Sequence, residues 1–341
     1  MNTKYLLCLL FLFQLFYFHC ASIFRGAPLP ETGSVALRPD FKPENVHYRP
    51  ALSNPRIVEL GFKAELEILK VEEPSTPYLL IWSFLPTESR AQRGFKIKQI
   101  KPSDYLTYID SRHGNRYAYW NLDSVDKIPD IQLRFSCTCY EQDYDIDPER
   151  VGDYDRTSAF YRFYTREDPA LIPFDQLETS TVRVEEKQNG FYAFQALGRG
   201  YSENDSTLLQ QHRNRLPDTT SVGNSINASV LFLSYCRASG IPARLVTGYR
   251  ITESEAAPWH WIEFFLPEYG WIPFDPCEPA ARIGYWPNRY FISTTGMNLE
   301  LPNLSQWVSS NKSQTQRYGL RFIKIVSNNI QLDKTVDVKV K

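Results

Sequence analysis

The sequence predicts an α+β protein with two domains, and two patterns in the chain carry that prediction. Between residues 56 and 142, short runs alternate apolar with polar positions and are rich in β-branched and aromatic residues, as is typical of antiparallel strands. Between residues 225 and 276, a helical run precedes three strand-like runs, which is an α+β order. A chain of 341 residues, 43% hydrophobic and 23% charged, is long and apolar enough to bury two cores.

The first 22 residues are predicted to be a signal peptide and to lie outside the fold. Residues 5–18 are apolar apart from Gln14, and this run is shorter than the roughly 20 apolar residues that a membrane span needs. Small residues from Cys20 onward suit cleavage, so the mature protein is expected to be exported. Attachment of a lipid to Cys20, as in a bacterial lipoprotein, and retention of the run as a membrane anchor stay open. Residues 23–45 are Pro-rich and aperiodic, which indicates a lead-in segment.

Residues 46–165 are predicted to form an antiparallel β domain. Gly114-Asn115, between two alternating runs, indicates a hairpin turn. No nucleophile or acid–base motif stands out in this part of the chain.

Cys8 and Cys20 fall in the predicted signal segment, which leaves four cysteines in the mature chain. These are Cys137, Cys139, Cys236 and Cys277. Cys137 and Cys139 alternate along a strand-like run, so both side chains are expected to face one way. Their spacing lacks the second close pair that a zinc site needs. Buried free thiols and a disulfide both stay open, and neither a metal nor a cofactor is predicted.

The overall charge is near balance, with 38 basic and 39 acidic residues. Because no basic stripe stands out, a nucleic-acid partner is not expected. Contact with a membrane is expected only through an N-terminal anchor. Function must therefore be sought in motifs rather than in the overall charge.

Residues 166–300 are predicted to form the second domain, followed by a β extension over 301–341. A helix is expected over 182–197, followed by a polar loop. A second helix over 227–239 is apolar on much of its circumference, as in a buried helix. Gly240 suits the left-handed residue that ends a helix, and Pro242 cannot continue one.

Several short motifs together resemble the core of the transglutaminase-like superfamily, which has a papain-like fold. They are Gly-Asn at 223–224, Gly-Ile-Pro-Ala-Arg at 240–244, Gly-Tyr at 248–249, Trp-Ile-Glu at 261–263 and Gly-Trp-Ile-Pro-Phe-Asp-Pro at 270–276. The resemblance implies a papain-like core preceded by an antiparallel β domain, as in many bacterial members. It also implies nucleophilic acyl transfer, in which a Cys at a helix start attacks, a His moves the proton and an Asp orients the His.

The resemblance assigns the three catalytic positions to Ser225, Trp259 and Asp275. The nucleophilic Cys and the catalytic His are thus replaced, and a serine hydroxyl is a poor nucleophile without a base in reach. His260 is one residue late, and on a regular strand it should face away from Trp259 and Trp261. Only a β-bulge would turn it toward the site. The resulting prediction is a pseudoenzyme that binds a protein or a cell-envelope polymer in the remaining cleft.

Two other functions stay open. One is an active acyltransferase or peptidase-type hydrolase that uses Ser225 with His260 and Asp275. The other is an envelope scaffold without a ligand.

Three tryptophans, Trp259, Trp261 and Trp271, could line a ligand groove, since aromatic walls suit a peptide or glycan. Packing of the sheet is the alternative for Trp261 and Trp271. Cys236 could be proposed as a substitute nucleophile, but a buried small apolar role is favoured for it.

Overall fold

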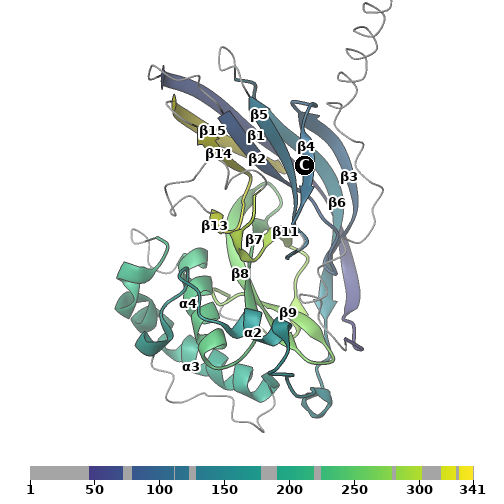
Figure 1. Ribbon diagram of the computed structural model, residues 1–341. Coiled ribbons are helices and arrows are strands. Elements are labelled where there is room, and N and C mark those ends of the chain that lie inside the picture. The colour runs from purple at the N-terminus through teal and green to yellow at the C-terminus, as the bar shows by residue number, and fades with distance from the viewer. Residues whose placement is uncertain are drawn as a thin grey trace, which may run out of the picture.

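The computed structural model describes residues 46–71, 79–110, 112–122, 128–177, 190–218, 224–278, 282–301, 316–327 and 330–340 (Figure 1). The predicted signal peptide over 1–22 and the lead-in over 23–45 lie outside these residues. Within them, no helix has the length and apolar character needed to cross a membrane.

Strands outnumber helices in the described chain, and the α+β class predicted from the sequence is confirmed. The longer helices are α2 (Ala159–Thr165), α3 (Gly190–Gln211) and α4 (Ser225–Ala238), with short 3-10 turns η2 (Pro148–Arg150), η3 (Phe174–Gln176) and η4 (Arg213–Arg215). The strands are β1 (Ala51–Val71), β2 (Leu79–Leu85), β3 (Gln92–Lys101), β4 (Leu106–Ile109), β5 (Arg116–Leu122), β6 (Ile131–Asp143), β7 (Ala243–Ile251), β8 (Ala256–Leu266), β9 (Gly270–Phe274), β10 (Tyr285–Trp286), β11 (Tyr290–Thr295), β12 (Met297–Leu299), β13 (Gln316–Tyr318), β14 (Ile323–Ser327) and β15 (Ile330–Val340).

Two antiparallel sheets form the β part of the molecule. One has the order β10-β6-β1-β15, with β3 paired to β6, and the other has the order β14-β2-β5-β4. The side chains of β6 are buried at every second position along most of its length, so one face of this sheet points into a core. Phe62 of β1 meets Phe84 of β2 edge-on at 5.3 Å between ring centres, so side chains of the two sheets pack together in that core.

The last strands of the chain complete both of these sheets. β15 pairs with β1, with Leu60 opposite Val340, and β14 pairs with β2, with Ile323 opposite Ser83. The β extension expected over 301–341 therefore includes strands that are part of the sheets begun by the N-terminal half (Figure 1). The domain boundaries drawn from the sequence stay a prediction.

The second half of the fold is a sheet of order β11-β7-β8-β9, with α3 and α4 packed on one of its faces. Phe264 of β8 stacks on Phe194 of α3 at 3.5 Å, and Phe232 of α4 meets the same Phe194 ring edge-on. In Figure 1, α2, α3 and α4 gather at the end of the molecule opposite the long strands β1 and β15.

One prediction about this half is wrong in part. α3 continues to Gln211, where the sequence favoured a polar loop. Phe194, Leu197 and Tyr201 recur at helical spacing, and all three are buried with Leu209, so one apolar face holds the polar residues in a helix. The first part of the helix expected over 182–197 lies outside the described residues.

Candidate functional site

Ser225 is the first residue of α4, and a capping residue fixes its place. Asn224 precedes the helix in an extended conformation, and its Oδ1 accepts a hydrogen bond of 3.0 Å from the Asn227 N–H. The Asn224 Nδ2 donates to Asp218 Oδ2 at 2.7 Å, which ties the helix start to the preceding loop. Ser225 is 8% exposed, so its hydroxyl lies at the margin of the core.

The other end of α4 turns the chain into the sheet. Gly240 has φ +78, a left-handed conformation that favours glycine, and the Ile241 N–H bonds to the Cys236 carbonyl. This stop directs the chain into β7, which pairs with β8 beneath the helix.

Strand β8 pairs with β7 in an unbroken register from Ala243–Phe264 to Ile251–Ala256. No bulge interrupts this pairing, so Trp259 and His260 face opposite sides of the sheet. The bulge that would turn His260 toward Trp259 is absent from this pairing. The contact between His260 and Ser225 is made by the backbone instead, since the His260 N–H donates to Ser225 Oγ at 3.1 Å.

The His260 imidazole is buried at 2% exposure, and its Nδ1 has no hydrogen-bond partner among the described residues. Burial, aided by the positive charge of Arg321, lowers the pKa of His260 to about 3. The ring is therefore neutral at pH 7 and a weak base.

Trp259 and Asp275 are joined directly. The Trp259 Nε1–H donates to Asp275 Oδ2 at 2.7 Å, and the Tyr290 hydroxyl donates to the same oxygen at 2.8 Å. The Cys277 N–H donates to Asp275 Oδ1 at 2.9 Å. Burial raises the pKa of Asp275, and these three donors act in the opposite direction. An indole N–H thus occupies the carboxylate that would orient a catalytic imidazole.

The hydrogen bonds of Ser225 describe its chemical environment. Ser225 Oγ accepts from a backbone N–H, and within the described residues no imidazole or carboxylate accepts its proton. A serine hydroxyl needs such a base to attack a carbonyl at neutral pH.

A groove with a volume of about 1010 Å³ opens beside these residues. Ser225, Trp259 and His260 all line it, so the structure places three of the four predicted catalytic-position residues at one groove. The groove is also lined by the C-terminal segment, defined here as residues 316–323, and by side chains of β15. Asp275 does not line the groove but is hydrogen-bonded to Trp259, which does.

Residues 185–276 match the model of the transglutaminase-like superfamily. This part of the chain is a transglutaminase-like core. No protein among curated sequences matches the chain.

Solved structures also resemble the chain. A candidate cysteine protease from Cytophaga hutchinsonii aligns with a TM-score of 0.53 and 12% identity, over 86% of this chain and 92% of that one. The periplasmic domain of TgpA from Pseudomonas aeruginosa, bound to ethylmercury, aligns with a TM-score of 0.26 and 15% identity, over 65% of this chain and 91% of that one. The first similarity supports the papain-like fold predicted for the transglutaminase-like core.

Two of the three tryptophans expected to line a ligand site do not line the groove. Trp261 is 0% exposed and packs on Trp286 and Tyr290, with ring centres 5.3 and 5.4 Å away. These neighbours cover Trp261 completely, so its ring does not reach the groove. Trp271 lies under the Arg244 guanidinium, 4.2 Å from the ring centre. Sheet packing, the alternative for both, explains them.

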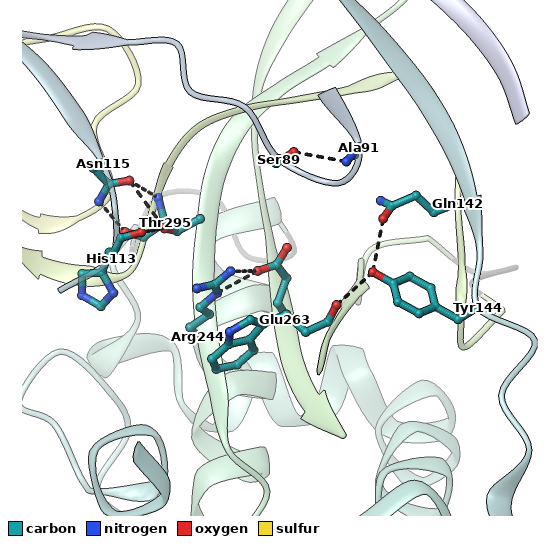
Figure 2. A network of polar contacts seen from close by, with 10 residues as sticks. Ser89, Ala91, His113, Asn115, Gln142, Tyr144, Arg244, Glu263 and Thr295 are labelled. Carbon is teal, nitrogen blue, oxygen red and sulfur yellow. Dashed lines mark hydrogen bonds and ion pairs between the residues drawn. The ribbon is translucent and has the colours of Figure 1, made fainter. Parts of the chain in front are cut away.

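Arg244 and Glu263 form a buried ion pair on this packed face of the transglutaminase-like core. Arg244 Nε and Nη2 lie 2.7 and 2.6 Å from Glu263 Oε2, and the two side chains are 14% and 11% exposed. Figure 2 shows the pair between the Asn115–Thr295 contact, which joins the turn before β5 to β11, and the Gln142–Tyr144 contact at the end of β6. The pair joins opposite positions of the neighbouring strands β7 and β8.

None of the four described cysteines is in a disulfide. Cys137, Cys139 and Cys236 are buried, and Cys277 is partly exposed. Burial raises the pKa of Cys236, which disfavours the thiolate that a nucleophile requires. Across the described ranges, no group of three or more His, Cys, Asp and Glu side chains is arranged to hold a metal ion.

Sequence reasoning did not identify Tyr290 or the C-terminal segment as parts of the site. Tyr290 lies on β11, and only the pairing of β11 with β7 brings it to Asp275. No local motif marks it. The cationic residues of the C-terminal segment were the one available signal, but nothing in the sequence pairs that segment with β8.

Proposed function

We propose that this protein is a non-catalytic transglutaminase-like protein whose groove binds a partner protein or a cell-envelope polymer. The observation that carries the proposal is the bonding of Asp275. Its carboxylate receives three donors, one of them from Trp259, so a catalytic dyad has been replaced by a structural one. The groove remains open next to it.

Two features of Ser225 support the same proposal. Its hydroxyl accepts the His260 N–H, and the part of the chain that the structure describes provides no base for its proton. Capping by Asn224 holds the helix start in place. A papain-like cleft thus keeps its shape while lacking the groups that generate a nucleophile.

Acyl transfer from a glutamine-containing peptide to a fluorescent amine tests the absence of catalysis. The unmodified protein should show no turnover and should not be labelled at Ser225 by a fluorophosphonate. Turnover that disappears in Ser225→Ala would contradict the proposal.

A double variant tests whether the site has lost only its reacting groups. Ser225→Cys with Trp259→His should place a thiol and an imidazole at the two positions, next to Asp275. If the double variant transfers acyl groups and Ser225→Cys alone does not, the result supports a site whose scaffold is intact.

The second candidate function is a serine hydrolase with His260 as the base. The proximity of His260 to Ser225 favours it, but the ring has a pKa of about 3 and the contact is made through its backbone. His260→Gln distinguishes the two functions: it should abolish any Ser225-dependent hydrolysis and leave ligand binding intact.

Export belongs to the proposal as well. The apolar run over 5–18 supports secretion into the periplasm or to the cell surface. Fractionation of cells, with intact-mass measurement of the mature protein, separates cleavage from lipid attachment at Cys20 and from retention of the run.

A further inference from the structure

The groove has a cationic wall. Arg317, Arg321 and Lys334 line it, all three are exposed, and none is in an ion pair with a carboxylate of the described chain. Asp218 is the one carboxylate among the described lining residues, and its Oδ2 accepts from Asn224 Nδ2. The whole chain carries a net charge of −1, so the positive charge at this wall is a local feature.

The backbone that presents these arginines is fixed to the sheet. The Leu320 N–H donates to Thr294 Oγ1 at 2.8 Å, and the Leu320 carbonyl accepts from Ser293 Oγ at 2.9 Å. Gly319 lies so close to the sheet that a Cβ there would meet Thr247 Oγ1 at 2.0 Å. Arg317 and Arg321 therefore extend from a preorganised segment, which reduces the entropy lost when a ligand binds.

The floor of the groove offers backbone acceptors. β9 pairs with β8 only from Ile262 onward, so among the described strands the first part of β8 has no partner on that side. The His260 N–H points to this edge, where it meets Ser225. By the alternation of an antiparallel strand, the carbonyl groups of Pro258 and His260 point there too, and Pro258 has no N–H.

We propose that the groove binds an acidic peptide segment in extended form, whose Asp or Glu carboxylates meet Arg317, Arg321 and Lys334. The N–H groups of a peptide can donate to the carbonyl acceptors of the β8 edge. An anionic polysaccharide or a polyphosphate has fewer such donors. Recognition of acidic motifs by arginine clusters and addition of an extended peptide along a strand edge are both established modes of peptide binding. This inference rests on the proposed binding function and names the chemistry of its ligand.

Fluorescence anisotropy tests the inference with the full mature chain and three labelled peptides. They share one sequence, with Glu, Gln or Lys at alternate positions. The Glu peptide should bind most tightly, and its affinity should fall as salt increases, because exposed charges are screened. Equal affinity for the Glu and Gln peptides would overturn the acidic assignment and leave binding by the groove standing.

Matched variants locate the site. Arg317→Glu with Arg321→Glu and Lys334→Glu should weaken binding of the Glu peptide by about tenfold. A control carries Arg93→Glu, Lys96→Glu and Arg199→Glu, which are equally exposed and lie outside the groove, and its affinity should be unchanged. Equal weakening in both triple variants would refute the placement.

Single variants guard against misfolding of the triple variant. Arg321→Gln removes the charge and leaves a shorter, polar side chain, and circular dichroism checks the fold. A photo-crosslinker in the Glu peptide should label the C-terminal segment and β15. Displacement by polyphosphate as effective as by unlabelled peptide would overturn the peptide assignment. Absence of binding by all three peptides would overturn both this inference and the proposed binding of a peptide.

Discussion

Trp259→Phe tests whether the indole N–H stabilises the buried Asp275. The substitution keeps an aromatic ring and removes the donor that lies 2.7 Å from Oδ2. Asp275 is 2% exposed, and a hydrogen bond to a charged group is worth about 1.5–3 kcal/mol. Because Tyr290 still donates to the same oxygen, we expect a loss of about 2 kcal/mol in the free energy of unfolding at pH 7.

The loss should depend on pH in a defined direction. Asp275 titrates near 3.8 without perturbation, and burial raises its pKa in the folded state. A group with a raised folded pKa contributes stability at low pH that is lost as the pH rises through that pKa. Trp259→Phe removes a donor to the ionised form and raises the folded pKa further. The difference from the unmodified protein should therefore be smallest near pH 4, grow as the pH rises and then level off.

Urea unfolding followed by circular dichroism at several pH values measures this difference. Trp261→Phe is the matched control, because Trp261 is buried and its Nε1 has no partner in the described structure. Its loss comes from packing and should be the same at every pH. A pH-independent loss in Trp259→Phe, equal to that of the control, would refute the role assigned to the indole N–H.

Three further substitutions test other parts of the structure. Glu263→Gln leaves the Arg244 charge buried without its partner, and urea unfolding should show a loss of about 3 kcal/mol. Gly319→Ala places a Cβ 2.0 Å from Thr247 Oγ1; the loss should be about 1–3 kcal/mol, with faster hydrogen exchange in the C-terminal segment. Asn224→Ala removes the cap of α4, and thermal unfolding should show a loss of about 1 kcal/mol.

Each of these substitutions has a control or a contrary outcome. Gly61→Ala is the partner of Gly319→Ala, because a Cβ at Gly61 meets nothing within 4 Å, and it should leave stability close to that of the unmodified protein. If Glu263→Gln is as stable as the unmodified protein, the attraction between Arg244 and Glu263 does not offset the free energy needed to bury the two charges. If Asn224→Ala is as stable as the unmodified chain, the capping bond does not fix the helix start.

The local signals of the sequence predicted the transglutaminase-like core well. Gly240 and Pro242 end α4 and begin β7, because few residues tolerate the left-handed conformation and because proline cannot continue a helix. Period-two alternation in β8 separated Trp259 from His260. These features follow from neighbours along the chain, which is why residue spacing was sufficient to predict them.

Contacts between distant segments were not predictable in this way. The Tyr290–Asp275 bond depends on the packing of β11, and the groove depends on the C-terminal segment lying over β7 and β11. Sheet packing and a ligand wall were both open for Trp261 in the sequence, and in the structure Trp286 and Tyr290 cover it. Tertiary packing determines whether such a side chain is buried or lines a site, and the periodicity of the sequence does not predict that packing.

The pairing of β1 with β15 has a consequence for how the molecule folds. Leu60 and Val340 are partners at opposite ends of the described chain, and the transglutaminase-like core lies between them in sequence. Pairing across so large a separation has a high cost in loop-closure entropy and slows folding. The sheet that contains β1 cannot be completed until β15 has been synthesised, so the transglutaminase-like core, which is synthesised between the two strands, can form first.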